Sequence, residues 1–192
     1  GSEVVQKEKE QWMLKITAYS QKLLDGLDEV DYLPRIKMEQ RNWIGRSEGA
    51  EMNFPLSVEG KSLKIFTTRP DTIYGATFMV IAPEHPIVEE IQGSITNMDQ
   101  VREYQDFAAK KSEFERKLPS KKKTDVQLEG VYAVNPVSGQ KLPVYMSDYV
   151  LISYGTGAIM CVPAHDERDW AFAQKFGIPM IEVIAGGDIS KE

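Results

Sequence analysis

Cysteine and histidine are scarce in this chain of 192 residues, which contains one cysteine, Cys161, and two histidines, His85 and His165. A single cysteine excludes an internal disulfide, and so few soft ligands exclude a structural zinc site of the cysteine-rich kind. Long apolar runs are also missing, because no stretch approaches the ~20 residues that a membrane-spanning helix needs. We therefore expect neither a disulfide scaffold, nor a metal centre, nor a membrane partner.

The remaining composition is that of an ordinary globular domain. Hydrophobic residues make up 42% of the chain and charged residues 27%, close to the average for soluble proteins. Acidic residues outnumber basic ones by 29 to 23, and the net charge of −6 argues against a free-standing nucleic-acid-binding domain. The opening Gly1-Ser2 resembles a tag remnant, and no signal peptide follows it. We expect a soluble, cytoplasmic domain taken from a larger protein.

Near the N-terminus, apolar residues recur every three or four positions between Lys7 and Leu27, which predicts an amphipathic helix. Asp25-Gly26 is a plausible stop, and residues 28–34 predict a turn-rich connector. The apolar stripe indicates packing against a partner surface rather than a ligand groove. We assign residues 1–40 to this helical segment with its connector and residues 41–192 to a second domain.

The second domain is rich in short apolar runs bounded by Gly, Pro and Asn, which predict strands. The predicted strands are Ala50–Phe54, Leu63–Thr67, Thr77–Ala82, Gly130–Val134, Lys141–Met146 and Ala158–Val162, with helices over His85–Gln92, Met98–Lys117 and Asp166–Phe176. Residues 135–139 predict a hairpin turn. The fold class expected is α+β, with a largely antiparallel or mixed sheet that closes into a β-barrel and carries flanking helices.

One stretch runs against the overall charge. Residues 110–123 hold seven basic residues against two acidic ones, a local charge of +5. Such a run is usually a solvated helix end and loop. The alternative is a contact for a phosphate backbone supplied elsewhere in a larger protein.

The first segment that could carry chemistry is Thr67-Thr68-Arg69-Pro70-Asp71-Thr72, directly after a predicted strand. Pro70 fixes its own φ and pushes Arg69 toward extended geometry, so the segment is stiff. Hydroxyl groups on a stiff loop can position a water molecule or bind an ester oxygen. Threonine alone is a weak nucleophile, and the segment has no neighbouring base. A plain strand exit with hydroxyl caps is the alternative.

The second segment runs from Tyr154 through a Gly-Thr-Gly turn and an apolar strand to Pro163, and a helix then opens at Asp166. Acidic residues in a first turn complement the helix dipole, which is one interpretation of Asp166. Asp169 lies one turn further on, where a carboxylate could capture an ammonium group. His165 could act as a base, although a histidine beside a helix start is more often a structural hydrogen-bonding group.

Together these segments resemble the editing domain of leucyl-tRNA synthetase, of bacterial or organellar type. Residues 40–49 resemble the insertion junction, residues 67–72 the threonine-rich peptide, and residues 155–169 the Gly-Thr-Gly to His-Asp-x-Arg-Asp peptide. The editing domain of the valyl enzyme is similar but typically carries Glu where this chain has Asp71, and the isoleucyl pattern lacks the arginine. The resemblance implies a β-barrel that hydrolyses the ester between a wrong amino acid and the terminal adenosine of leucine tRNA.

The resemblance also implies roles for individual residues. Asp169 would hold the α-ammonium group of the substrate, and Thr67 and Thr68 would bind the ester and its attacking water. Thr72 would exclude leucine, and Arg69 would contact the tRNA end. Residues that would line or shape the substrate pocket are Tyr154, Met160, Val162, His165 and Asp166.

The implied partners are the 3′-terminal adenosine and acceptor end of leucine tRNA, noncognate amino acids (isoleucine, methionine, valine or norvaline) and the remainder of the synthetase. The resemblance implies no cofactor and no metal for editing, and no aminoacylation by this chain alone. A module that binds adenosine-like ligands or the acceptor end, with editing lost, is the alternative function.

Overall fold

The computed structural model describes residues 9–112, 115–116, 124–153 and 155–186. The chain divides into two compact units, a small one over residues 6–48 and a large one from Gly49 onward. The border expected between residues 40 and 41 stays a prediction. Within the described ranges, no helix is long and apolar enough to span a bilayer.

The small unit contains a 3₁₀ turn, η1 (Ile16–Tyr19), and the helices α1 (Ser20–Gly26) and α2 (Pro34–Ile44). The predicted helix from Lys7 is therefore too long, since residues 9–15 are not helical. Trp12, Met13 and Leu14 at this end are at least 80% exposed. Short amphipathic helices draw most of their stability from packing, and among the described residues the first part of the apolar stripe is exposed.

Helix α2 has no counterpart among the elements predicted from the sequence. Pro34 occupies its first turn, and Gly45 follows its last residue with a positive φ of 65°. Proline just inside the start of a helix and glycine just past its end are strong signals of a helix boundary. Proline lacks the N–H that would be unpaired in the first turn, and glycine tolerates the left-handed conformation after the last one. Both signals are present in the segment interpreted as connector and junction.

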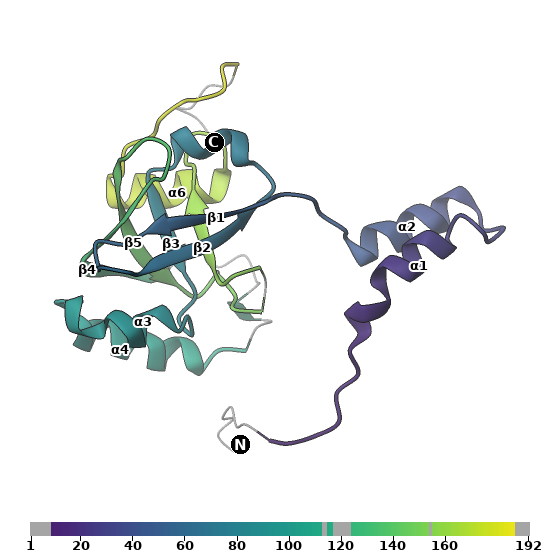
Figure 1. The fold of residues 1–192 in the computed structure, drawn as a ribbon, viewed down its shortest axis with the longest axis horizontal. Coiled ribbons are helices and arrows are strands. Elements are labelled where there is room, and N and C mark those ends of the chain that lie inside the picture. The colour runs from purple at the N-terminus through teal and green to yellow at the C-terminus, as the bar shows by residue number, and fades with distance from the viewer. Residues whose placement is uncertain (1–8, 113–114, 117–123, 154, 187–192) are drawn as a thin grey trace. The chain divides into compact units, whose positions relative to one another are not determined.

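The large unit contains two sheets (Figure 1). Strands β1 (Ala50–Pro55) and β2 (Ser62–Thr67) form an antiparallel pair. The other sheet has the order β4-β5-β3-β6, built from β3 (Phe78–Ile81), β4 (Asp125–Val134), β5 (Lys141–Ser147) and β6 (Ala158–Cys161). The β3–β5 pair is parallel and the other pairs are antiparallel, so the sheet is mixed, as predicted. The expected closure into a barrel is not shown, since outside these ladders the described strands are joined by one bridge, Leu56–Ala133.

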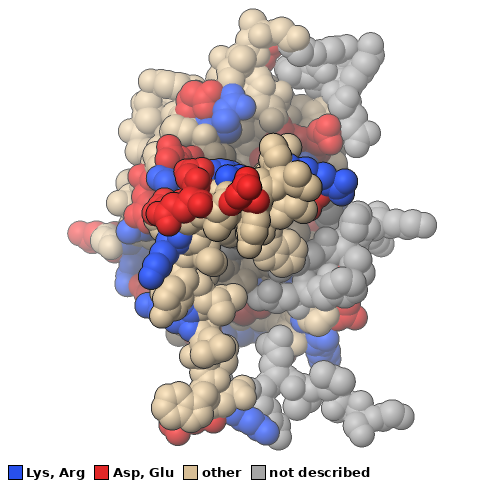
Figure 2. Space-filling model, turned by 90° about the vertical axis from the view of Figure 1, so that its right-hand side faces the viewer, with Lys and Arg blue, Asp and Glu red and all other residues tan. Residues whose placement is uncertain are grey.

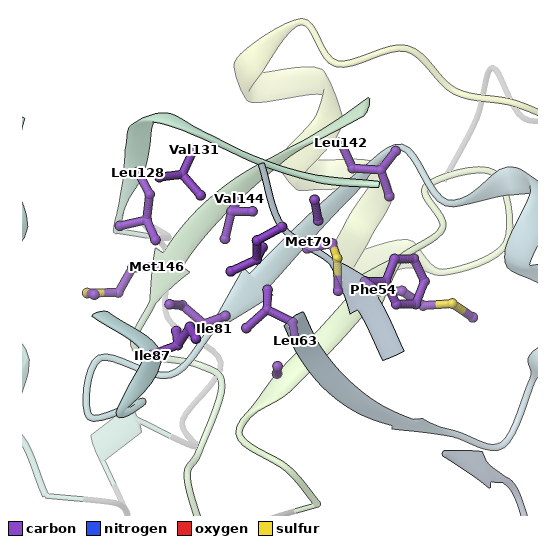
Figure 3. Close-up of a cluster of buried hydrophobic side chains, with 14 of the residues drawn as sticks. Phe54, Leu63, Met79, Ile81, Ile87, Leu128, Val131, Leu142, Val144 and Met146 are labelled. Carbon is purple, nitrogen blue, oxygen red and sulfur yellow. The ribbon is translucent and has the colours of Figure 1, made fainter. Parts of the chain in front are cut away.

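Both faces of the four-stranded sheet are covered, which explains why every residue of β3 is buried. On one face, Met79 and Ile81 of β3 pack with Phe54 and Leu63 of the β1–β2 pair, as the close-up shows (Figure 3). On the other face, Phe78 stacks on Phe172, with ring centroids 4.8 Å apart. Strand β3 therefore lies inside the sheet, between β5 and the edge strand β6, with packed residues on both faces.

In the described part of the large unit, the helices with defined bounds are η2 (Pro70–Gly75), α3 (Ile87–Ile91), η3 (Gln92–Ser94), α4 (Met98–Ala109) and α6 (Glu167–Phe176). Helix α4 ends eight residues before the predicted Lys117. A new helix start explains this, because Ser112 and Glu115 form a reciprocal capping box: Ser112 Oγ accepts the Glu115 N–H at 3.2 Å, and Glu115 Oε2 accepts the Ser112 N–H at 2.8 Å.

The basic stretch is partly used inside the fold. Lys111 Nζ lies 2.6 Å from Asp148 Oδ2, and Arg116 donates to the backbone carbonyls of Asp148 and Val150. Lys117 and Lys121–Lys123 lie outside the described residues. Elsewhere, acidic and basic side chains are interspersed on the face drawn in Figure 2.

Candidate functional site

The threonine-rich segment leaves β2 as a tight turn and enters η2. Thr67 is half-buried, and its Oγ1 accepts the N–H of Arg69 at 3.0 Å, which fixes the turn. Thr68 and Arg69 are exposed. Arg69 donates to Asp71 from Nε at 3.0 Å and from Nη2 at 2.9 Å, and this bond from Arg69 is the main reason that the pKa of Asp71 is lowered. The turn therefore presents an exposed ion pair beside a threonine hydroxyl.

Thr72 is the buried member of this segment, with 3% of its surface exposed. Its hydroxyl donates to the backbone carbonyl of Arg69 at 2.9 Å, and its own N–H donates to the same oxygen at 3.2 Å. A β-branched side chain has few rotamers, and a hydroxyl tied to the backbone selects one of them. The Thr72 side chain is thus buried and held in one orientation by the backbone.

Helix α6 begins as the sequence predicts, immediately after the turn that follows β6. Asp166 is its N-cap, and Asp166 Oδ1 accepts the N–H groups of Arg168 at 2.9 Å and of Asp169 at 3.1 Å. These bonds satisfy two of the amide groups that a helix start leaves unpaired. The main observed role of Asp166 is therefore to cap the helix.

Asp169 is buried, with 8% of its surface exposed, although it carries an ionisable carboxyl group. Its Oδ2 accepts the N–H of Val162 at 2.8 Å, which ties the first turn of α6 to the end of β6. Burial, followed by the charge of Asp169, raises the pKa of the Cys161 thiol well above its usual value. The carboxylate therefore stands at the junction of strand and helix, and Cys161 beside it stays protonated.

His165 acts as a hydrogen-bond acceptor. Its Nε2 accepts the N–H of Val183 at 3.1 Å and that of Ile184 at 3.2 Å. In both bonds Nε2 is the acceptor, which leaves Nδ1 as the ring nitrogen that can donate. This geometry matches the structural interpretation of His165 and fastens the C-terminal segment to the turn before α6.

The fold brings the two sequence segments together. Thr77, which follows η2, donates its N–H to the Cys161 carbonyl at 3.1 Å, and β3 then pairs with β6. A Cβ built on Gly75 would lie 3.1 Å from Val162 Cγ1. His165 is close enough to Asp71 to lower its pKa slightly. The turn that holds Thr67–Thr72 and the turn that precedes Asp169 are therefore neighbours.

Met160 and Val162 lie in the main hydrophobic cluster, together with Ile73 of η2. Their role as pocket walls stays a prediction. Tyr154 lies outside the described residues. The two glycines of the Gly-Thr-Gly turn have positive φ values, 63° at Gly155 and 72° at Gly157, which an L side chain rarely adopts.

A second layer of residues behind the threonine-rich turn could not be recognised in the sequence. Asn135, in the β4–β5 hairpin turn, is fully buried, and its Nδ2 donates to the Ile73 carbonyl at 2.8 Å. Gly75 is covered by the C-terminal segment, since its Cβ would lie 3.0 Å from the Ile181 carbonyl oxygen and 3.1 Å from Val183 Cγ2. Asn-Pro in a hairpin signals a turn, but no local pattern reveals a bond across 62 residues.

A hollow of about 430 Å³ lies elsewhere on the large unit, lined by residues that include Lys61, Lys64, His85, Glu90 and Thr156. Lys61 is paired with Glu90 at 2.7 Å, and Lys64 with Glu51 at 3.1 Å. Thr156 links this hollow to the Gly-Thr-Gly turn, but neither Thr72 nor Asp169 lines it. In the described part of the chain, His, Cys, Asp and Glu side chains form no group of three that could hold a metal ion.

Comparison with known proteins gives a consistent result. A family model described as "Leucyl-tRNA synthetase, editing domain" matches residues 41–192. The chain is 54% identical over 191 residues to a leucine–tRNA ligase from Alkaliphilus oremlandii, and the alignment covers 100% of this chain and 24% of that protein. A leucine–tRNA ligase from Chlorobium limicola is also 54% identical, over 184 residues that cover 96% of this chain and 23% of that protein.

Among solved structures, the chain is similar to the synthetase in a crystal structure of the ternary complex of Agrobacterium radiobacter K84 agnB2 LeuRS, tRNA and LeuAMS. The TM-score is 0.75 and the sequence identity 36%, over 94% of this chain and 22% of that one. The chain therefore spans about a quarter of the length of the relatives that it matches.

Proposed function

The chain belongs to the family of leucyl-tRNA synthetase editing domains, and on this basis we propose that it is a post-transfer editing hydrolase. Its substrate is leucine tRNA esterified at the 3′-terminal adenosine with isoleucine, methionine, valine or norvaline. The observation that carries the proposal is the meeting of two segments, the threonine-rich turn and the turn before Asp169, across the β3–β6 pair.

The reaction needs little beyond positioning. Water adds to the carbonyl carbon of the aminoacyl ester, the bond from that carbon to the ribose oxygen breaks, and the free amino acid and the tRNA hydroxyl are released. An aminoacyl ester is already activated, so a held water molecule and a stabilised oxyanion suffice without a dedicated base. His165, whose Nε2 accepts two backbone N–H groups, then contributes to the architecture of the site rather than to proton transfer.

The proposed roles follow the positions of the side chains. Thr67 and Thr68 lie at the start of the exposed turn, where they bind the ester and the attacking water. Asp169 supplies the negative charge that holds the α-ammonium group, a charge-assisted contact that is strong when shielded from water. Met160 and Val162 border η2 in the core cluster and form part of the pocket for the amino acid and adenine.

The acidity of the chain fits a site that only receives the end of the substrate. The tRNA is held by the rest of the synthetase in this proposal, and the domain makes few phosphate contacts of its own. An editing site is needed because a synthetic pocket separates amino acids that differ by one methylene by only ~1–3 kcal/mol. The same limit applies to a pocket for leucine, which has to reject isoleucine, methionine, valine and norvaline by small differences in shape.

The proposal is tested by incubating the chain in molar excess with isoleucyl-adenosine ester and with leucine tRNA that carries radiolabelled isoleucine. We expect release of isoleucine from both substrates well above the spontaneous rate. The small ester removes the need for tRNA contacts that other parts of a synthetase provide. Binding of both substrates without accelerated release would contradict hydrolysis and favour the alternative, a module that only binds the acceptor end.

Replacement of Arg69 should separate tRNA contact from capture of the amino acid. Arg69 is exposed and lies on the same turn as Thr67, so Arg69→Ala should weaken binding of the tRNA acceptor end while isoleucyl-adenosine is still hydrolysed. Asp71→Asn is the matched control, because it removes the ion-pair partner and leaves the guanidinium in place. Titration of tRNA against each variant measures the effect. Equal affinity of Arg69→Ala and the parent chain for tRNA would remove Arg69 from the interface.

A further inference from the structure

Thr72 can discriminate between amino acids only if the short helix that carries it stays in place, and the structure shows what holds that helix. Helix η2 is six residues long, too short to be rigid by itself. Its hydrogen bonds include the pair from Thr72 to the Arg69 carbonyl and one from the Ala76 N–H to the Ile73 carbonyl at 3.2 Å. Any other restraint comes from outside the helix, and one such contact is made by a residue whose side chain is completely buried.

That residue is Asn135, whose side-chain amide is used at both ends. On one side, Oδ1 accepts the N–H groups of Val137 at 3.0 Å and Ser138 at 3.2 Å, which shapes the β4–β5 turn. On the other side, Nδ2 donates at 2.8 Å to the carbonyl of Ile73, the residue next to Thr72. The exposed fraction of Asn135 is 0%, so water cannot replace either bond.

We propose that Asn135 is a specificity-positioning residue, which sets the location of Thr72 and thereby the ability of the site to refuse leucine. The proposal rests on the editing function proposed above and deepens it. Asn135 itself touches no substrate. It acts through the Ile73 carbonyl, and Gly75, covered by Ile181 and Val183, limits how far η2 can move once that bond is lost.

The critical variant is Asn135→Ser. A serine hydroxyl can still accept the turn N–H groups, but it is too short to reach Ile73 and leaves that carbonyl with only the Ala76 N–H, which donates to it at 3.2 Å. We expect leucyl-adenosine hydrolysis to rise at least about fivefold relative to isoleucyl-adenosine hydrolysis, because one buried hydrogen bond is worth roughly that factor. Ser138→Ala is the matched control: it removes a bond within the same turn, from the Gln140 N–H to Ser138 Oγ, and leaves Asn135 untouched.

A second variant protects the test against misfolding. Asn135→Asp keeps Oδ1 for the turn N–H groups and replaces Nδ2 by a second oxygen, and only its protonated form can donate to Ile73. The ratio of leucine to isoleucine release should therefore be raised at high pH and should fall toward the parent value as the pH is lowered through the pKa of that carboxyl. In the Thr72→Ala background, Asn135→Ser should add no further loss of selectivity, since both changes act on the same gate.

The inference is separable from the function itself. Affinities of amide analogues of leucyl- and isoleucyl-adenosine can be measured by calorimetry whether or not the parent chain hydrolyses the esters. If the parent does not hydrolyse them, the editing proposal fails, and the analogue affinities still test Asn135. A folded Asn135→Ser variant with the parent's leucine-to-isoleucine ratio would overturn the inference. So would a double variant in which Asn135→Ser lowers selectivity as much in the Thr72→Ala background as it does in the parent chain.

Discussion

We expect the Thr72→Ala variant to release leucine from correctly charged leucine tRNA roughly 10 to 200 times faster than the parent chain, while it still releases isoleucine. Leucine is no larger than isoleucine, so size alone cannot keep it out, and branching at Cγ must meet an obstacle. Thr72 suits that role because its side chain is buried and its hydroxyl is tied to the Arg69 carbonyl. Single-turnover deacylation of both esters measures the effect.

Three further variants identify which part of Thr72 matters. Thr72→Val keeps the branched shape and should still refuse leucine, whereas Thr72→Phe should close the site to both amino acids. Thr77→Ala is the matched control, because Thr77 is also buried and lies outside η2. If Thr72→Ala spares leucyl-tRNA as well as Thr77→Ala does, Thr72 is not the gate.

The second large effect concerns Asp169. Asp169→Asn should lower the rate of isoleucine release at least tenfold, because a charge-assisted hydrogen bond is worth ~1.5–3 kcal/mol. Asparagine is more informative than alanine here, since its amide oxygen can still accept the Val162 N–H that Asp169 Oδ2 accepts at 2.8 Å. Asp169→Ala would remove that bond as well, so a fall in its activity would mix lost charge with lost structure.

The control for this change is Glu167→Gln, which removes an exposed negative charge from the same first turn of α6. It should deacylate as the parent does and melt at nearly the parent temperature. Thermal melting of Asp169→Asn completes the test. A variant that melts several degrees lower and edits at the parent rate would make Asp169 a purely structural link between β6 and α6.

Much of the fold could be predicted from local patterns. Each strand of the large unit overlaps an apolar run that predicted it, although β4 begins at Asp125 rather than at the predicted Gly130. Helix α6 is capped by Asp166 as expected, because an aspartate cap and a following apolar stripe are both local signals. The errors arose where tertiary context decided. Residues 9–15 have helical spacing but are exposed, and α4 stops early because Ser112 and Glu115 start a new helix.

For the site, the sequence could identify the two segments but not what supports them. Motif resemblance picked out Thr72 and Asp169, and the structure adds that both side chains are buried and bonded to backbone groups. Asn135 could not be found in this way, because its bond to Ile73 depends on the β4–β5 turn folding back onto η2. Contacts between residues far apart in sequence leave no local pattern to read.

The order of the strands also governs how the domain forms. Strand β3 receives one neighbour from β5 and the other from β6, so its ladder is complete only when Cys161 is available. Pairing between strands so far apart in sequence is slow, because the loop between them must lose conformational entropy before any stabilising contact forms. During synthesis on the ribosome, the edge of Phe78–Ile81 that pairs with β6 must wait without its partner for about eighty residues. We therefore expect truncations before residue 158 to aggregate, and the two halves of the site to become functional in a single late step.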